Sequence, residues 1–586
     1  MTTQDVAAAL EEIGVLLQLQ GENDFKTRAY SAAARTIDQL QGDLTAMVAD
    51  GSLGNVRGIG EAIFDKVTIL VRTGRLPYLE ELRKSVAPGL IEMLRINGVG
   101  PKKVRAIHEH LAIDTIAGLK AACEDGRLAG LKGFGDKTAT KILDGIRFLD
   151  TTGHRVRYDL AFPLGMALLA QLKALPGVVR AELCGSLRRG KETAKDIDIV
   201  LSSSDPAPIM AAFVAMPQVM QVTGHGATKS SVVASLTLGH HTVVMNADLR
   251  IVTDAQFPVT VLHFTGSKEH NIRLRQRAIE RGLSLNDYAL TAEDVPVPVD
   301  SEADVYAELG LAFIPPELRE DAGEIEMASA KVLPTLIEPG DIRGVFHNHT
   351  TASDGTASLE EMALAAKALG YEYFGVGDHS QSLTVANGLT PDRVRAQWRE
   401  IDALNAKLKG VTILKGTECD ILADGELDFD DELLAGFDYV VASVHSLFGL
   451  SEEAQTARIC KALSHPAVTM LGHPTGRLLL RREGYKVNVE AVLQAAARHG
   501  KMVEINAQPE RLDLDWSHVR RAKALGVTLV INPDAHDPSG LALTKYGVIV
   551  ARRGGLSAGD VFNTQPIAAV RRILLARRAS EGHKGR

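Results

Sequence analysis

The chain has 586 residues, of which 45% are hydrophobic and 24% are charged, and its formal net charge at pH 7 is −8. This length is too great for a single hydrophobic core, so we expect three or more domains. The charge excludes a uniformly basic coat for nucleic acid. The absence of an apolar run near the roughly 18 residues that cross a bilayer excludes a membrane span, and four scattered cysteines favour a reduced cytoplasmic compartment.

Residues 1–150 are predicted to form short helices separated by glycine turns. Three Gly-X-Gly turns stand between helical segments, at 58–60, 98–100 and 133–135. In such helix-hairpin-helix patterns, amide groups exposed at the start of the second helix can bind a phosphate. Residues 81–150 carry 12 Lys and Arg against 9 Asp and Glu, whereas residues 1–80 carry 7 against 11. The glycines that we expect to meet DNA are Gly58, Gly60, Gly98 and Gly100.

Residues 151–320 mix helices and strands and contain a group of carboxylates. Asp196 and Asp198, in KDIDIVLS, lie two apart on a predicted strand and therefore face the same side. Asp248, in HTVVMNADLRIV, adds a third carboxylate from another strand. Three converging carboxylates would hold two Mg²⁺ ions, and the turn GSLRRG just upstream offers donors to phosphate oxygens. The alternative is a solvated edge strand beside a basic turn.

These motifs resemble the signatures of family X DNA polymerases of the nucleotidyltransferase superfamily. GSLRRG followed by DID is similar to their palm motif, and HFTGSKEHN followed by IRLRQRAIERG is similar to their thumb motif. The resemblance implies that Asp196, Asp198 and Asp248 are catalytic and bind two Mg²⁺ or Mn²⁺ ions. It implies that the nucleotide is bound by Ser186, Arg189, Phe264, Gly266 and Asn271, and that DNA is contacted by Lys229 and Arg275. His263, before Phe264, stands where many animal relatives carry tyrosine.

The resemblance extends to the N-terminal segments FKTRAYSAAARTI and GIGEAIFDKV. It implies that Lys26 contacts a 5′-phosphate and that Lys66 is the Schiff-base lysine of a deoxyribose-phosphate lyase. A Schiff-base lysine must be neutral when it attacks, which requires desolvation or a neighbouring cation. Because Asp65 and Glu61 are nearby, a solvated surface lysine is the alternative.

From residue 341 onward, seven apolar strand candidates alternate with helical segments. This pattern predicts a parallel sheet closed into a (β/α)7 barrel. Candidate metal ligands end six of these strands, on the face where barrel enzymes build their sites. Six histidines with three carboxylates suit Zn²⁺, Mn²⁺ or Fe²⁺ better than Ca²⁺. The nine residues are His347, His349, Asp354, His379, Glu418, His445, His473, Asp534 and His536.

This part of the chain resembles the polymerase-and-histidinol-phosphatase (PHP) domain, and all nine positions of its three-metal site are filled. The resemblance implies up to three Mn²⁺, Zn²⁺ or Fe²⁺ ions and hydrolysis of phosphoesters. Members of this kind show 3′–5′ exonuclease, abasic-site endonuclease and 3′-phosphatase activities. Arg477 and Arg511 either hold the substrate phosphate or form salt bridges within loops.

We therefore predict a multidomain, monomeric repair polymerase of the bacterial cytoplasm, bound to the nucleoid when on DNA. Its substrates would be gapped or primer-template DNA and deoxynucleoside triphosphates, in base excision or end repair. One alternative is a small-molecule phosphoesterase with a vestigial N-terminal half, and another is a DNA-binding scaffold without turnover. The predicted domains are a helical lyase-like domain at 1–80, a helix-hairpin-helix domain at 81–150, an α/β nucleotidyltransferase palm at 151–255, an α+β thumb at 256–320, a linker at 321–340 and the PHP domain at 341–586.

Overall fold

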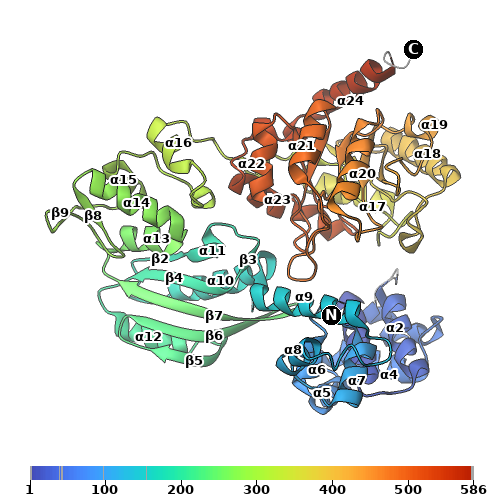
Figure 1. Cartoon of the computed structure of the whole chain (residues 1–586), viewed down its shortest axis with the longest axis horizontal. Coiled ribbons are helices and arrows are strands. Elements are labelled where there is room, and N and C mark those ends of the chain that lie inside the picture. The colour runs from blue at the N-terminus through green and yellow to red at the C-terminus, as the bar shows by residue number, and fades with distance from the viewer. Residues whose placement is uncertain are drawn as a thin grey trace. The chain divides into compact units, whose positions relative to one another are not determined.

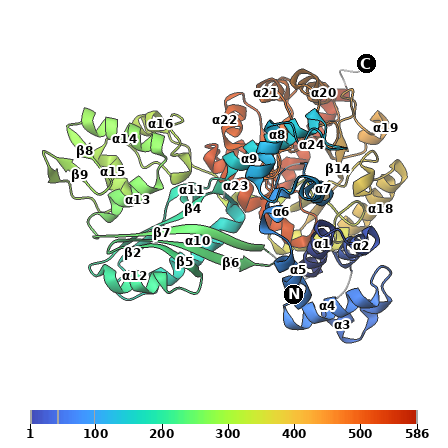
Figure 2. The same cartoon turned by 60° about the horizontal axis from the view of Figure 1, so that its bottom comes forward.

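The computed structural model describes residues 3–38, 40, 44–96, 98–153, 155–239 and 241–582. The chain divides into two compact units, whose elements are labelled in Figure 1 and seen from a second direction in Figure 2. One unit comprises residues 1–155 with 235–244, and the other comprises 156–234 with 245–586. Among the described residues, no helix is both long enough and apolar enough to cross a bilayer.

The first unit consists mainly of helices around one hydrophobic core. Leu10 and Ile13 from the predicted first domain share this core with Ile107 and Leu119 from the predicted second domain. Each Gly-X-Gly turn leads directly into a helix, and its first glycine has a positive φ, of 98°, 81° or 93°. The α-helices are α1 (Thr3–Leu19), α2 (Asp24–Asp38), α3 (Leu44–Ala49), α4 (Glu61–Thr73), α5 (Pro77–Ser85), α6 (Pro88–Met93), α7 (Pro101–Leu111), α8 (Ile116–Glu124) and α9 (Asp136–Thr152).

The palm is a sheet with the strand order β2-β4-β7-β6-β5, covered by short helices. Strands β4 and β7 are parallel, whereas β2 runs antiparallel to β4. Ile197 and Ile199 are buried beneath β4, which anchors the strand that carries the aspartates. The elements are β1 (Val156–Arg157), α10 (Tyr158–Lys173), β2 (Arg180–Leu183), α11 (Gly185–Arg188), β3 (Thr193–Ala194), β4 (Asp196–Ser202), α12 (Pro206–Val214), β5 (Val219–His225), β6 (Lys229–Leu238) and β7 (His241–Val252).

The thumb combines helices with a small antiparallel sheet, β8-β9-β10. Its helices, drawn in green to yellow-green, stand together in Figures 1 and 2. Its elements are α13 (Phe257–Thr265), α14 (Lys268–Glu280), β8 (Leu283–Leu285), β9 (Leu290–Ala292), β10 (Val295–Pro296), α15 (Glu302–Glu308) and α16 (Glu324–Ala330).

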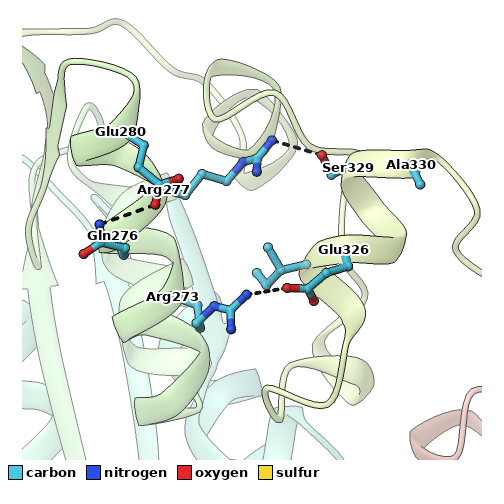
Figure 3. Close-up of a pocket in the computed structure, with 8 residues that line it drawn as sticks. Arg273, Gln276, Arg277, Glu280, Glu326, Ser329 and Ala330 are labelled. Atoms are coloured by element: carbon cyan, nitrogen blue, oxygen red, sulfur yellow. Dashed lines mark hydrogen bonds and ion pairs between the residues drawn. The ribbon is translucent and has the colours of Figure 1, made fainter.

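The segment predicted as a linker, 321–340, differs in the structure, because its first half packs as part of the thumb. Ile325 and Ala328 of α16 lie in the thumb core, and the buried carboxylate of Glu324 is 2.7 Å from Nδ1 of His270. A groove of about 630 Å³ separates α14 from α16. Figure 3 shows it crossed by an ion pair between Arg273 and Glu326 and by a hydrogen bond from Arg277 to Ser329. The polar start of the segment, DAGEIE, conceals the apolar side chains that hold it in place.

The C-terminal domain is a closed parallel barrel. Its sheets are β11-β12-β13 and β14-β15-β16-β17-β18, and β13 and β14 form one strand interrupted at Lys415. The amide of His349 donates to the carbonyl of Ala535 at 2.8 Å, which closes the ring beyond β11 and β18. The strands are β11 (Gly344–Val345), β12 (Tyr373–Gly375), β13 (Thr412–Leu414), β14 (Gly416–Asp420), β15 (Tyr439–Ser443), β16 (Met470–Leu471), β17 (Met502–Asn506) and β18 (Leu529–Asn532).

Helices follow most strands of the barrel and supply its outer layer, coloured yellow to red in Figure 1. They are α17 (Leu359–Ala368), α18 (Pro391–Lys407), α19 (Asp431–Leu434), α20 (Glu452–Ser464), α21 (Val489–Arg498), α22 (Trp516–Ala524), α23 (Thr544–Arg553) and α24 (Ile567–Gly582). Short 3-10 helices of the chain lie at Ser52–Asn55, Pro316–Leu318, Pro339–Asp341, Thr384–Ala386, Pro538–Leu543, Ala558–Asp560 and Phe562–Thr564.

The interior of the barrel is solid rather than hollow. Because side chains alternate along a strand, one set packs outward against the helices, and the other set forms a separate inner cluster. Tyr439 lies in that cluster, 1% exposed, and its hydroxyl donates to the carbonyl oxygen of Phe346. A Cβ atom at Gly375 or Gly416 would overlap this tyrosine, so both strands need glycine where they pass it. Val570 and Leu574 of α24 join the same cluster.

Candidate active sites

The three palm aspartates meet at one edge of the sheet because of the register of two neighbouring strands. Asp198 of β4 pairs directly with Asp248 of β7. Asp196 lies two residues before Asp198, on the same face of β4. The strand begins at Asp196, which leaves this end of the group open to solvent, whereas Asp198 is only partly exposed. The structure therefore brings together the carboxylates that the sequence predicted.

The electrostatics of this group fit a cation-binding site. Burial, followed by the charges of Asp196 and Asp248, raises the pKa of Asp198 to about 7. Nζ of Lys229 lies 2.9 Å from a carboxylate oxygen of Asp248 and supplies part of the missing positive charge. The acceptors are all carboxylate oxygens, the ligand type that Mg²⁺ and Mn²⁺ prefer. Cations at this edge would offset the repulsion that raises the pKa of Asp198.

The turn GSLRRG approaches the aspartates closely. Gly185 has a φ of 64°, and a Cβ atom there would overlap the carboxylate of Asp198. Ser186 follows within the short helix α11 and is partly exposed. Arg189 is buried, with Nε 3.1 Å from Glu320 and with Nη1 donating to the carbonyl of Thr265. Gly185 therefore brings the start of the turn against Asp198, whereas the guanidinium of Arg189 is directed to Glu320 and Thr265.

The predicted thumb residues cluster at the junction of α13 and α14. The guanidinium of Arg250 lies 4.7 Å from the ring centroid of Phe264. Nδ2 of Asn271 donates to the carbonyl of His263 at 2.8 Å. Arg275 forms an ion pair of 2.9 Å with Asp287. A Cβ atom at Gly266 would lie 3.1 Å from Nη1 of Arg189, which places the turn at Gly266 against the palm arginine.

The lysines predicted to act in the first unit have only local contacts. Lys26 is exposed and lies 3.4 Å from Glu22. Nζ of Lys66 donates to the carbonyl of Ala62 at 3.0 Å and lies 4.8 Å from the ring centroid of Tyr78. A cation over an aromatic face is attracted by the charge distribution of the ring. The turns place Gly60 and Gly100 at the N-caps of α4 and α7, with Gly58 and Gly98 two residues earlier.

The nine predicted ligands of the barrel converge around one carboxylate, that of Glu418. Its Oε1 lies 2.8 Å from Nε2 of His473 and 3.3 Å from Nε2 of His445. Its Oε2 lies 2.9 Å from Nδ1 of His379 and 3.2 Å from Nε2 of His347. Four overlapping groups have ligand atoms within 4.8 Å of one another: His349, Asp354, His379 and His536; His347, His349 and Asp534; His347, Glu418 and His473; and His379, Glu418 and His445.

The donor atoms of this cluster fit bound metal ions. Both ring nitrogens of His349 are buried, as are Nε2 of His347 and Oε1 of Glu418, and the short contacts of these atoms lack hydrogen-bond geometry. Buried polar atoms are normally hydrogen-bonded, and imidazole nitrogens gathered around carboxylates are the ligands of Zn²⁺, Mn²⁺ and Fe²⁺. Although burial alone would raise the pKa of Glu418, the surrounding imidazoles hold that pKa well below its usual value. Burial, with His536 and His379 nearby, lowers the pKa of His349 to about 4.

Two further acidic residues orient the ligands, and the sequence analysis missed both. Glu504 is fully buried and lies 2.7 Å from Nδ1 of His347. Asp420 contacts Nδ1 of His445. A carboxylate on the second ring nitrogen of a ligating histidine fixes its orientation and tautomer. The signal that could have revealed Glu504 is a lone acidic residue inside the apolar strand MVEIN.

The two loop arginines of the barrel differ in their surroundings. Arg477 donates to the carbonyls of Arg511 and Leu512 and lies 3.4 Å from Asp515. These contacts favour a loop salt bridge over phosphate binding. Arg511, in contrast, has Nε 3.7 Å from the ligand Asp534, at the edge of the cluster.

Known families match four segments of the chain. The DNA polymerase beta thumb matches residues 260–320 and the PHP domain matches residues 346–508. A helix-hairpin-helix domain matches residues 1–76, and a SAM-like helix-hairpin-helix tandem matches residues 90–147.

Curated relatives match the chain over very different spans. The DNA polymerase/3′-5′ exonuclease PolX of Bacillus subtilis (strain 168) is 39% identical over 584 residues, which cover 98% of this chain and 99% of that protein. A probable phosphatase of Thermoanaerobacter sp. (strain X514) is 29% identical over 229 residues, 37% of this chain and 89% of the phosphatase. A probable phosphatase of Shewanella oneidensis is 29% identical over 202 residues, 32% of this chain and 75% of that protein. From the near-complete match to PolX, together with the thumb and PHP segments, the chain belongs to the bacterial family X DNA polymerases that carry a PHP domain.

Proposed function

We propose that the chain fills short gaps in DNA with its palm and removes or repairs 3′ ends with its barrel. The observation that carries this proposal is the presence of two complete ligand sets. One consists of three aspartates on two paired strands, and the other consists of nine barrel residues. A phosphoesterase with a vestigial N-terminal half would not need the first set. A DNA-binding scaffold would need neither.

In the palm, Asp196, Asp198 and Asp248 would hold two Mg²⁺ or Mn²⁺ ions. When bound, such ions lower the pKa of the primer 3′-hydroxyl and neutralise the leaving pyrophosphate. Ser186 would donate its hydroxyl hydrogen to a phosphate oxygen, and Arg189 would add a charge-assisted hydrogen bond. These residues are proposed to orient the triphosphate for attack by the primer end.

At the thumb, Phe264 and Gly266 would lie against the sugar of the incoming nucleotide. Asn271 and Arg275 sit on the first turns of α14, and we assign them to contacts with the nucleotide and the DNA minor groove. Lys229 would exchange its partner Asp248 for a DNA phosphate once cations occupy the palm.

In the barrel, His347, His349, Asp354, His379, Glu418, His445, His473, Asp534 and His536 would hold up to three Mn²⁺, Zn²⁺ or Fe²⁺ ions. Such ions activate water for attack on phosphorus and stabilise the leaving oxygen. Glu504 and Asp420 keep two imidazoles in the orientation that ligation requires. We propose 3′–5′ exonuclease, abasic endonuclease and 3′-phosphatase reactions on DNA, because each of them is a metal-assisted hydrolysis of a phosphoester.

For the first unit we propose DNA binding through the amides that follow Gly58, Gly60, Gly98 and Gly100, with Lys26 near a 5′-phosphate. Lys66 is proposed as the nucleophile of a weak lyase activity. Borohydride trapping of a 5′-deoxyribose-phosphate end, compared with Lys66→Ala, tests that role. We further propose a monomer that acts on nucleoid DNA in the cytoplasm.

The two-site proposal is tested with a labelled primer on a one-nucleotide gap bearing a 5′-phosphate, in Mn²⁺. Asp198→Ala is expected to abolish extension and to leave 3′ degradation intact. His349→Ala is expected to do the reverse. Extension by Asp198→Ala would exclude the palm as the polymerase site, and degradation by His349→Ala would place the nuclease outside the barrel.

A further inference from the structure

Helix α23 of the barrel domain packs against the palm turn that precedes the catalytic aspartates. Gly190, the last residue of GSLRRG, has a φ of 66°, and a Cβ atom there would overlap the side chain of Ile549 on α23. The turn and the helix therefore meet at a distance that only glycine permits. Around this contact, charged side chains from the two domains are interleaved.

Arg553, the last residue of α23, joins two acidic residues that lie outside the barrel. Its side chain has no exposure to solvent. Nη1 lies 3.1 Å from Glu192, two residues after the palm turn, and Nη2 lies 3.1 Å from Glu320, which precedes α16 in the thumb. The guanidinium also lies 4.8 Å from the ring centroid of Trp516. Buried charges of this kind must remain paired, because loss of one partner leaves the others uncompensated.

Glu320 connects Arg553 to Arg189, a residue of the proposed nucleotide site. The oxygen that Arg553 contacts, Oε1, also accepts from Nε of Arg189 at 3.1 Å. The carbonyl of Thr265 accepts from Nη1 of the same arginine. Acceptors at both Nε and Nη1 fix the plane of the guanidinium. The orientation of Arg189 thus depends on a carboxylate that the barrel domain holds in place.

We propose that Arg553 is a positioning residue for nucleotide incorporation, which makes the phosphoesterase domain a structural part of the polymerase site. Arg553 does not touch the nucleotide and acts through Glu320 on Arg189. The inference rests on the proposed role of Arg189 in binding the triphosphate. Small displacements of a phosphate-binding group weaken substrate binding and alignment, so loss of Arg553 should affect the nucleotide more than the DNA.

The test is Arg553→Met in the full-length chain, with steady-state gap filling measured against nucleotide concentration. The KM for the nucleotide is expected to rise about tenfold, with kcat and the KM for DNA changed less than about threefold. Arg553→Lys should recover part of the loss, because lysine keeps the charge but cannot bridge two carboxylates as a guanidinium does.

The matched control is Arg552→Met, one residue earlier on the same helix. Arg552 instead bridges Glu317 and Glu338, at 2.8 and 2.5 Å, and donates to the carbonyl of Ile337. Its replacement should leave the KM for the nucleotide unchanged. An equal rise in the control variant, or an unchanged KM in folded Arg553→Met, would overturn the proposal.

Two further measurements keep the proposal testable if Arg553→Met folds poorly. Glu320→Gln preserves shape but removes the shared charge, and its KM for the nucleotide should also rise; no change or a fall overturns the inference. In Arg189→Met, adding Arg553→Met should raise KM no further, because both changes act through one group. Fully additive effects would mean that Arg553 acts elsewhere. Asp198→Ala tests the polymerase site itself and does not depend on these results.

Discussion

The palm and the barrel both gather carboxylates for metal ions, but they balance charge in opposite ways. In the palm, three aspartates repel one another, and a single lysine offsets one of them. In the barrel, six histidines surround three carboxylates and partly neutralise them. A site that repels itself should bind cations weakly and together with a substrate. A site preassembled from buried imidazoles should keep its ions between reactions.

Metal stripping gives the largest expected effect and sharpens this comparison. After chelation and removal of the chelator, addition of Mg²⁺ alone should restore primer extension, while 3′ degradation stays reduced by about 100-fold or more. Adding Mn²⁺ or Zn²⁺ should then recover degradation, and metal analysis of the untreated protein should find ions that survive gel filtration. Recovery of both activities with Mg²⁺ alone would erase the distinction between the sites.

The substitution Gly185→Ala is expected to affect the palm activity alone. A Cβ atom at this position would overlap the carboxylate of Asp198, so the turn or the aspartate must move. Extension should fall about 100-fold, while degradation stays unchanged. Gly177→Ala is the control in the same domain, because Gly177 shares the positive φ, 83°, but its Cβ would lie 3.8 Å from the nearest atom, Oγ of Ser203. Normal extension by Gly185→Ala would show that the close approach is dispensable.

The substitution Glu504→Ala is expected to affect the barrel activity alone. Without the carboxylate that contacts Nδ1 of His347, the imidazole loses its fixed orientation. Metal affinity, measured by competition with a chromogenic chelator, should fall about 10- to 100-fold, and extension should be unaffected. Glu504→Gln keeps an acceptor for the imidazole N–H and should restore much of the affinity. Equal losses in the two variants would indicate a packing defect instead.

The smallest expected effect concerns pH. The pKa of Asp198 is raised to about 7 in the fold, so its neutral form suits the metal-free palm. Stability from this group is therefore complete below about pH 4, the value of an exposed aspartate, and is lost as pH rises through 7. In metal-free protein at pH 8, Asp198→Asn should stabilise the fold by about 1–2 kcal/mol, allowing for partial exposure.

Thermal unfolding from pH 4 to 8 checks this expectation. The gain from Asp198→Asn should shrink as pH falls below 7 and vanish near pH 4. Addition of Mg²⁺ should reverse the order at pH 8, because cations stabilise only the charged wild-type site. A gain that is independent of pH would mean that the substitution stabilises the palm for another reason.

The two sites also differ in how much of them a sequence reveals. Asp196 and Asp198 could be predicted from the sequence because strand side chains alternate. The barrel ligands could be predicted because they follow apolar strands. Glu504 was missed because its role depends on a contact with His347, 157 residues away. The link from Arg189 through Glu320 to Arg553 was missed for the same reason, since pairing between distant charges leaves no local pattern.

Fold prediction failed where composition misled. The polar start of segment 321–340 suggested a linker, but Ile325 and Ala328 anchor α16 in the thumb. A helix of seven residues offers too few turns for a periodic signal. The split of one barrel strand at Lys415 was likewise invisible, because an interruption of one residue does not disturb the apolar run.

Tyr439 and the rest of the inner cluster fill the barrel interior and close it at one end. Because the inner cluster and α24 fill one end of the barrel, we expect substrates to reach the ligands from the opposite end, where the strands finish. A DNA 3′ end that enters by this route must also leave by it. Each released nucleotide would then have to leave past the bound strand. We therefore expect degradation of low processivity, with few nucleotides removed per binding event, because each product leaves by the route that the DNA strand occupies.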